Sequence, residues 1–431
     1  MSTENMGTIL GSLFREKVKK SKDPRMEEGV FDVLYSTGFL EIDFLNGYTV
    51  HVNDGSNQFS YDSIGLVDGS TNTLIGRPGS GKTTLAVQMA ANIVRNFDQG
   101  LIFYDDIEGG SVETRRLVLT GFTQEELTQK MIYRNCAVSA ENFYERLSMI
   151  ADIKLQNRDQ FLYDTGKVDS KGEPIFKMQP TVYILDSLAM LSPEKLTEEE
   201  KLSGQMSATA MAKTNTQVFK RSIPKIKAAN IILIIINHIN DKVDISPFAK
   251  TRAQVGYLKQ DETLPGGKAA IYLTNNLIRV EDMSKLKAED GMGVSGKIIE
   301  ISFVKSRTNE SGKSVPLVFE NKTGFDPDLS LLLFMKSTGG VESRGAYLNV
   351  KGSDIKFTQK GFKDKLYTDE QFQYEFNSVC YQKLRELLND APIETHNPRK
   401  MGATAGIMGM INGNNGMPSQ SLPKNYDLGS L

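Results

Sequence analysis

The chain has 431 residues, of which 39% are hydrophobic and 24% charged, and its formal net charge is −2. This composition is typical of a soluble globular protein of about two or three domains, and the charge excludes a uniformly basic nucleic-acid coat while leaving a local basic loop open. Two cysteines without a C-x-x-C pattern and three scattered histidines provide no metal framework and suit a reducing compartment. We find no signal peptide or membrane-spanning run, so we expect a cytoplasmic protein without membrane association.

The first stretch with a clear pattern is residues 7–20, where apolar side chains recur at helical spacing beside a basic face. This pattern is typical of an amphipathic helix, and we assign residues 1–34 to an N-terminal helical and oligomerisation segment. Its basic face fits contact with DNA, a solvated surface or docking on a neighbouring subunit, and the sequence leaves these alternatives open. Residues 36–47 are apolar and lead into a short strand. The polar stretch 53–70 predicts a loop or a surface hairpin.

Residues 71–90 carry the pattern G-x-x-x-x-G-K-[ST] between an apolar run that predicts a strand and a segment that predicts a helix. A phosphate-binding loop requires this strand–loop–helix context. The glycines let backbone N–H groups turn toward an anion, Lys82 brings a positive charge to the β- and γ-phosphates, and Thr83 offers a hydroxyl to Mg²⁺. The residues expected to line the nucleotide are Gly76, Arg77, Pro78, Gly79, Ser80, Gly81, Lys82, Thr83 and Thr84.

Carboxylates follow the next two predicted strands. The strand at 100–104 leads into a run of acidic residues that ends at Glu108, and the strand at 181–185 is followed by Asp186. Ligands of open α/β sheets bind at the carboxyl ends of the strands. Glu108 there suits a general base for the water that attacks the γ-phosphate, with an exposed acidic turn as the alternative. An apolar strand ending in Asp is the Walker B pattern, so we expect Asp186 to hold Mg²⁺ through water.

Between these strands, residues 110–165 look helical and 164–179 predict a surface loop or hairpin. After them come a charged loop at 191–209 and a helix at 210–228. The fourth strand, 231–236, is apolar throughout, as expected for a strand covered on both faces.

His238 follows the fourth strand, where a polar residue suits sensing of the γ-phosphate, although a lone histidine is more often structural. The long stretch 239–267 has no clear periodicity. Cations interleaved with aromatic residues fit contact with single-stranded nucleic acid, while several acidic residues weaken that signal. Its candidate contacts are Lys242, Phe248, Lys250, Arg252, Tyr257 and Lys259.

The rest of the chain predicts a change of character at residue 326. We expect strands at 269–280, 297–305 and 315–320, with a polar turn region at 281–296, and then helices at 329–335 and 369–388. Residues 326–390 are assigned to a small C-terminal domain. The Gly-, Asn- and Met-rich stretch 391–431 is expected to be disordered.

Several segments together resemble the bacterial RecA recombinases, and most closely the bacteriophage UvsX-type recombinases, over roughly residues 35–388. They are STGFLEIDFLNG before the phosphate loop, FYDDIEGG, YILDSLAML, IIINHI, LPGGKAA and FVKSRT. The resemblance implies that Glu108 is catalytic, that Asp186 binds Mg²⁺ and that His238 senses the γ-phosphate. UvsX-type proteins have His at the last of these positions, whereas RecA has Gln.

The resemblance also implies roles that the residue patterns alone do not. Lys305 and Arg307 match the two cations that reach the ATP of the adjacent subunit, with the logic of an arginine finger. Arg115 stands where the family has an aromatic residue that stacks on adenine, and Arg can also stack on a base. Gly266 and Gly267 match the pair that closes the second DNA-binding loop.

The expected fold is α/β: a RecA-type P-loop NTPase core at 35–325 with a mostly parallel twisted sheet, an N-terminal helical segment and a small C-terminal α+β domain. The implied activity is that of a DNA-dependent ATPase, with ATP and Mg²⁺, that forms helical filaments on single-stranded DNA and exchanges strands with homologous duplex DNA. Its DNA-binding loops would lie at 191–209 and 239–267. A single-strand-binding protein and a recombination mediator are implied partners. A hexameric DNA helicase and an ATP-binding DNA scaffold are the alternatives.

Overall fold

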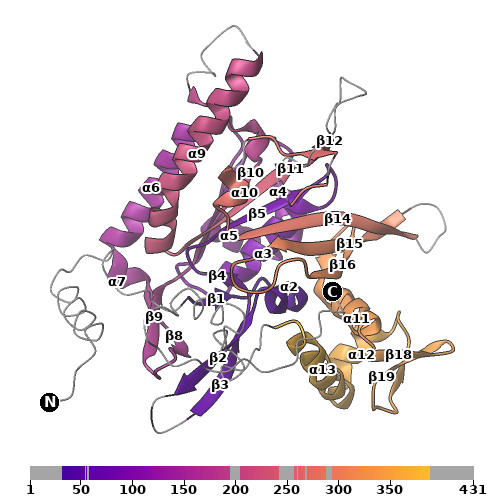
Figure 1. Ribbon diagram of the computed structural model, residues 1–431. Helices are drawn as coiled ribbons and strands as arrows, with labels where there is room; N and C mark the ends of the chain where they lie inside the picture. The colour runs from indigo at the N-terminus through magenta and orange to yellow at the C-terminus, as the bar shows by residue number, and fades with distance from the viewer. Residues whose placement is uncertain are drawn as a thin grey trace, which may run out of the picture. The chain divides into compact units, whose positions relative to one another are not determined.

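The computed structural model describes residues 32–53, 55, 58–194, 204–241, 257–259, 261–266, 269–287 and 294–388. Its central feature is a nine-stranded sheet in the order β17-β16-β15-β14-β5-β11-β10-β6-β7 (Figure 1). Neighbouring strands from β14 to β7 are parallel, and those from β17 to β14 are antiparallel. This arrangement confirms the predicted α/β class with a mostly parallel sheet. The strands are β5 (Thr71–Gly76), β6 (Leu101–Asp106), β7 (Met131–Arg134), β10 (Thr181–Asp186), β11 (Ile231–His238), β14 (Asn276–Lys287), β15 (Val294–Lys305), β16 (Ser314–Glu320) and β17 (Gly324–Asp326).

Helices cover both faces of this sheet. The central strands β10 and β11 are buried almost to their last residue, as their uninterrupted apolar runs predict. On one face lies α3 (Lys82–Val94), and on the other α6 (Ala140–Gln156) and α9 (Gly204–Ala228) lie side by side (Figure 1). Phe143 and Phe219 pack between these two helices and the sheet. Each large apolar side chain removed from water contributes about 1.5–3 kcal/mol, so the two layers hold the strand ends firmly.

The stretch 110–165, predicted to be helical, also contains a strand. It forms α4 (Glu113–Thr120), α5 (Gln124–Lys130), α6 and α7 (Arg158–Phe161), but β7 lies between α5 and α6 at the edge of the sheet. The prediction was wrong at β7 because four residues are too few to show an alternating pattern. Pairing with β6 rather than local preference therefore decides the conformation there.

The boundaries near β14 also differ from the prediction. Ala269–Tyr272 form the short helix α10, so the strand expected from residue 269 begins only at Asn276. The region 281–296, expected to be a turn, is largely strand, because β14 runs on to Lys287 and β15 starts at Val294. The outer half of β14 is mostly exposed, so it lacks the alternation of a half-buried strand. The helix expected to begin at residue 210 begins at Gly204.

Two hairpins occupy the stretches for which the sequence left loop or hairpin open. One joins β2 (Tyr48–Asn53) to β3 (Gln58–Ser63), and the other joins β8 (Leu162–Val168) to β9 (Pro174–Met178). The hairpins touch each other, because the Tyr61 hydroxyl donates to the Val168 carbonyl at 2.7 Å. Close by, β1 (Leu34–Tyr35) pairs with β4 (Leu66–Val67), and α2 (Leu40–Leu45) precedes the first hairpin.

The residues from 327 to 388 form helices and a three-stranded sheet around an aromatic cluster of Phe357, Phe362, Phe372 and Phe376. This cluster continues into the apolar core beneath the large sheet. The division at 326 stays a prediction. The elements are α11 (Pro327–Ser337), β18 (Val341–Arg344), β19 (Tyr347–Val350), β20 (Lys356–Phe357), α12 (Phe362–Thr368) and α13 (Glu370–Arg385).

The predictions for the helix at 7–20 and the tail at 391–431 lie outside the described residues, as do most of the two predicted DNA-binding loops. Within the part that the structure describes, none of the helices has both the length and the apolar character needed to span a bilayer.

Candidate nucleotide site

The phosphate loop lies between the end of β5 and the start of α3, as predicted. Gly79 and Gly81 have φ values of +76° and +94°, which other residues adopt only with strain. A Cβ on Gly76 would lie 2.3 Å from the Val280 carbonyl oxygen of β14. The loop can therefore pass close to β14 and direct its backbone N–H groups toward the start of α3. A helix of 13 residues adds the positive end of its dipole at this point.

Lys82 is held over this loop by backbone oxygens. Its side chain is buried, and its ammonium donates to the carbonyls of Gly76 at 3.0 Å and Arg77 at 2.8 Å. Burial lowers the pKa of Lys82 to about 8, while the nearby carboxylates of Asp186 and Glu108 oppose this effect. An anion bound beside the ammonium would favour its charged form. The loop thus presents a cation that is well placed for a phosphate group.

Asp186 ends β10 opposite Asp106 of β6 and bonds to the phosphate-loop helix. The Thr83 hydroxyl donates to Asp186 Oδ2 at 2.7 Å. Asp186 Oδ1 is buried and has no hydrogen-bond partner among the described residues. Burial raises the pKa of Asp186 to about 6, an effect that a bound cation would reverse. A free carboxylate oxygen next to a threonine hydroxyl is the oxygen donor set that Mg²⁺ prefers, so these residues fit the predicted ion.

Glu108, Ser187 and His238 meet beside this pair, at the ends of three neighbouring strands. Glu108 Oε1 accepts a hydrogen bond from the Ser187 hydroxyl and lies 2.7 Å from Nε2 of His238. A carboxylate only accepts hydrogen bonds, so Nε2 carries the proton at this contact. Strand pairing places His238 opposite Gly76, and the Ile239 N–H donates to the Gly76 carbonyl at 3.0 Å. The strand end that carries His238 is therefore attached directly to the phosphate loop.

The same strand end contacts the predicted second DNA-binding loop. Asn237 Nδ2 donates to the Pro265 carbonyl at 3.0 Å, and Gly266 packs against Leu188. The short strands β12 (Asn240–Asp241) and β13 (Glu262–Thr263) pair at the base of the loop. Arg77 of the phosphate loop forms a two-pronged ion pair with Asp241, with its closest contact at 2.6 Å.

Only part of the predicted DNA-contact set can be placed. Tyr257 is half-buried and packs against an apolar cluster, and the Lys259 ammonium pairs with Glu281 at 2.7 Å. Lys242, Phe248, Lys250, Arg252 and Gly267 lie outside the described residues.

The structure does not bring Lys305 and Arg307 to the phosphate loop of their own chain. Lys305 is the last residue of β15 and pairs with Leu277 of β14, which pairs with Thr73 of β5. Because β15 is antiparallel to β14, the chain beyond Lys305 continues toward the amino ends of β14 and β5. The Lys305 ammonium donates to backbone carbonyls at the end of α10, the nearest at 2.9 Å, and Arg307 donates to one of them at 3.3 Å. Burial, with the neighbouring Arg307, lowers the pKa of Lys305 to about 8. The two cations therefore lie toward the amino ends of the parallel strands, on the opposite edge of the sheet from the nucleotide site at the carboxyl ends.

No family model matches the chain, but it is similar in sequence to several known proteins. The chain is 24% identical over 363 residues to a plasmid RecA protein of Lactococcus lactis subsp. lactis, covering 81% of this chain and 91% of that protein. It is 25% identical over 174 residues to a RecA protein of Mannheimia haemolytica (40% and 43% covered). It is also 32% identical over 106 residues to DNA repair protein RAD51 homolog 4 of Mus musculus (24% and 32% covered). The chain has RecA-family homology at modest identity.

Arg115, for which the resemblance predicts a contact with adenine, lies beside the turn between β16 and β17. Its guanidinium donates to the carbonyls of Asn321 at 3.3 Å and Lys322 at 2.5 Å. This turn approaches the phosphate-loop helix, because a Cβ on Gly324 would lie 3.0 Å from the Thr84 side chain. Arg115 thus lies near the start of α3 but contacts no residue of the phosphate loop among the described contacts.

Sequence reasoning missed four side chains that support the site. The Tyr104 hydroxyl donates to Asp186 Oδ2 at 3.4 Å, and the Lys297 ammonium donates to the Gly79 carbonyl at 2.5 Å. Asp106 and Tyr133 bond to each other beside Glu108 at 2.8 Å. No spacing in the sequence identifies these contacts. Strand β7 was not predicted, and Lys297 lies in a predicted strand but reaches Gly79, which is distant in the sequence, only through the pairing of the sheet.

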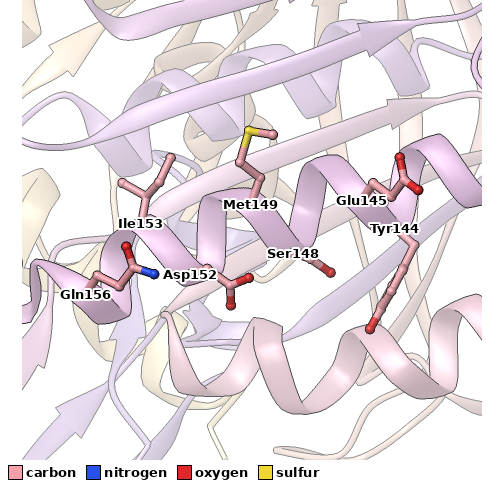
Figure 2. Close-up of a pocket in the computed structure, with 7 residues that line it drawn as sticks. All are labelled: Tyr144, Glu145, Ser148, Met149, Asp152, Ile153 and Gln156. Atoms are coloured by element: carbon pink, nitrogen blue, oxygen red, sulfur yellow. The ribbon is translucent and has the colours of Figure 1, made fainter.

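A surface hollow of about 440 Å³ lies elsewhere, on α6. Figure 2 shows that its lining side chains all project from this one helix, with Met149 and Ile153 pointing away from Ser148 and Asp152. None of the predicted site residues lines it. We therefore locate the candidate site at the carboxyl edge of the sheet and not in this hollow.

Proposed function

We propose that this protein is an ATP-dependent DNA recombinase, most similar to the phage UvsX type, that polymerises on single-stranded DNA and catalyses homologous pairing and strand exchange. It would serve recombination, repair and recombination-dependent replication in the host cytoplasm. The observation that carries the proposal is the contact of Glu108 with His238, on a strand end that also touches the phosphate loop and Pro265. The match along 91% of a RecA protein supports the same activity.

In this proposal the phosphate loop and its neighbours hold Mg-ATP. Lys82 binds the β- and γ-phosphates, and Thr83 and Asp186 hold Mg²⁺, with Asp186 acting through water. The bound ion would neutralise charge on the phosphate oxygens. Glu108 orients the attacking water and takes its proton. Arg115 stacks on the adenine.

His238 would report the state of the γ-phosphate. Its ring contacts Glu108 and its backbone pairs with Gly76 of the phosphate loop, so a γ-phosphate that attracts the imidazole N–H would change the hydrogen bond between His238 and Glu108. The adjacent Asn237 passes the movement to Pro265 and so to the loop 239–267. DNA bound in that loop would be sensed at the nucleotide by the same contacts, because coupling between two sites is reciprocal.

Lys305 and Arg307 would act on the ATP of the neighbouring subunit. Their place on the opposite edge of the sheet fits this role, since a cation that cannot reach its own nucleotide can still reach the one across a filament interface. In nucleotide hydrolases an arginine supplied in this way increases the rate by about 10³–10⁵-fold. ATP would then stabilise the filament, and hydrolysis would loosen it.

The remaining parts have roles by analogy. We propose that residues 1–34 join subunits, that the loops at 191–209 and 239–267 bind DNA, and that residues 326–390 form a C-terminal domain. A single-strand-binding protein and a mediator are the expected partners.

The decisive experiment is joint-molecule formation between a labelled single strand and homologous duplex DNA, with ATP and Mg²⁺. Lys82→Ala is compared with Lys336→Ala, which removes an exposed lysine of α11. We expect joint molecules that require homology with the wild type and the control, and none with Lys82→Ala. Unwinding without homology would instead identify a helicase, and DNA binding without pairing or unwinding would identify a scaffold.

A further inference from the structure

The loop that carries Glu108 is held by a cluster of side chains that lies outside the proposed ATP and magnesium ligands. It consists of Asp106 at the end of β6, Arg116 of α4 and Tyr133 of β7, and we call it the loop clamp. Asp106 is 2% exposed and Arg116 is 8% exposed. None of these three side chains belongs to the phosphate loop or to the proposed magnesium ligands.

Asp106 forms the centre of the loop clamp. Its Oδ1 accepts a hydrogen bond from the Gly109 N–H at 2.8 Å, and its Oδ2 accepts from the Ser111 N–H at 2.9 Å and from the Tyr133 hydroxyl at 2.8 Å. Every partner is a donor, which suits an ionised carboxylate because that group only accepts. Asp106 therefore fixes the backbone that follows Glu108.

Arg116 completes the clamp from the other side of the loop. Its Nη1 donates to the Ser111 carbonyl at 2.6 Å, so Ser111 is held at its N–H by Asp106 and at its carbonyl by Arg116. The guanidinium lies 3.7 Å from the centre of the Tyr133 ring, a cation–π contact. Tyr133 thus bonds to one member of the clamp and packs on the other.

The loop needs such restraint because of its sequence. Glu108 is followed by Gly109 and Gly110, and Gly109 has a φ of +76°. Two adjacent glycines give the backbone after Glu108 great freedom, so the contacts of its carboxylate with Ser187 and His238 would have to hold the residue without support from the chain that follows. The front of the loop is fixed where the Ile107 N–H donates to the Asp186 carbonyl at 2.6 Å. Among the described contacts, the hydrogen bonds to residues 109–111 all come from the clamp.

We propose that Asp106, Arg116 and Tyr133 are positioning residues that hold the Glu108 carboxylate where it activates water, so that they set the rate of hydrolysis and not the affinity for ATP. This inference rests on the proposed function, because it assumes that Glu108 is the general base. Misplacing a catalytic group by about 1 Å costs roughly 100-fold in rate. A side chain that never touches the nucleotide can therefore control turnover.

The neighbouring residues Asp105 and Asp106 provide a matched pair for the test. Asp105 is equally buried, at 3% exposed, but it bonds to the Tyr183 hydroxyl and to Arg146, and neither partner belongs to the Glu108 loop. Asp106→Asn places an NH₂ group against donors and frees the loop. Asp105→Asn makes the same chemical change on the other side of the strand.

Turnover of ATP is measured with saturating single-stranded DNA, together with the Kd of a fluorescent ATP analogue. We expect Asp106→Asn to reduce kcat about 100-fold with little change in Kd, and Tyr133→Phe, which removes a single hydroxyl, to reduce kcat about 5-fold. Asp105→Asn should retain wild-type kcat. In a Glu108→Gln background, Asp106→Asn should cause no further loss, because the two residues then act as a unit.

The outcomes separate the inference from the proposed function. The inference would be overturned if Asp105→Asn and Asp106→Asn reduced kcat equally. It would also be overturned if Asp106→Asn reduced kcat about 100-fold again in the Glu108→Gln background. In both cases the proposed ATPase activity would remain supported. If Asp106→Asn does not fold, wild-type kcat in Tyr133→Phe overturns it equally. A wild-type protein that hydrolyses no ATP would overturn the proposed function, and this inference with it.

Discussion

A buried carboxyl group outside the site should make the stability of the fold depend on pH. Glu41 of α2 is fully buried, and neither side-chain oxygen finds a hydrogen-bond partner outside the residue itself among the described residues. Burial raises the pKa of Glu41 to about 8 from its ordinary value of 4.5, with a smaller contribution from the charge of Asp43. The α13 residue Cys380 lies close enough that the charge of Glu41 affects it. Ionising Glu41 would therefore place an unpaired charge between α2 and α13.

The sign of the effect follows from proton binding. Between pH 4.5 and 8 the folded chain keeps the proton on Glu41 while the unfolded chain releases it, so stability falls as the pH rises through this window. A difference of one in pKa between the folded and unfolded chains corresponds to about 1.4 kcal/mol, which makes the loss on the order of 3 kcal/mol at pH 7 and on the order of 5 kcal/mol by pH 8. Glutamine cannot ionise, so Glu41→Gln removes this dependence.

We expect Glu41→Gln to match the wild type near pH 5 and to exceed it by a few kcal/mol at pH 8. The measurement is the free energy of unfolding from urea titrations at several pH values. Glu145→Gln, which alters an exposed carboxyl of α6, is the control and should show no such trend. An advantage of Glu41→Gln that stays constant between pH 5 and 8 would refute the reasoning.

Three further predictions concern the site. Glu108→Gln should reduce ATP hydrolysis to a small residual rate but keep ATP-dependent DNA binding, whereas Glu108→Ala should lose both, as measured by phosphate release and by DNA fluorescence anisotropy. Asn237→Ala, which removes the contact with Pro265, should reduce stimulation of the ATPase by DNA about 5-fold with little change in the basal rate. Lys82→Ala and Arg307→Ala should each be inactive alone but recover hydrolysis when mixed, because one chain supplies the phosphate loop and the other the cation; no recovery would contradict action between subunits.

The sequence could predict what depends on long apolar runs and on glycine chemistry. The buried strands β10 and β11 and the phosphate loop between β5 and α3 are of this kind. Carboxyl ends of parallel strands meet at one edge of a sheet, and the structure places Glu108, Asp186 and His238 together at that edge. What each of these residues does stays a proposal.

The sequence could not predict features that exist only through tertiary pairing. Strand β7 has four residues and no period of its own, and it forms because β6 offers an edge. Asp106 looks like one more acidic residue of a turn until the fold shows that Gly109, Ser111 and Tyr133 all donate to it. Asp105 and Asp106 point to opposite sides of β6, and this decides which of the two binds the loop. The composition of the chain does not indicate which residue points to which side.

In the proposed mechanism the Glu108 carboxylate would serve both hydrolysis and sensing. Ser187 and His238 both bond to Oε1, and Oε2 has no protein partner among the described contacts. Oε2 is therefore available to take a proton from water while Oε1 keeps its contact with His238. Glutamine retains an oxygen that accepts from His238 but has no group that can take a proton, so it separates the two tasks. Alanine removes both oxygens, and the difference between the two variants measures what the contact with His238 contributes.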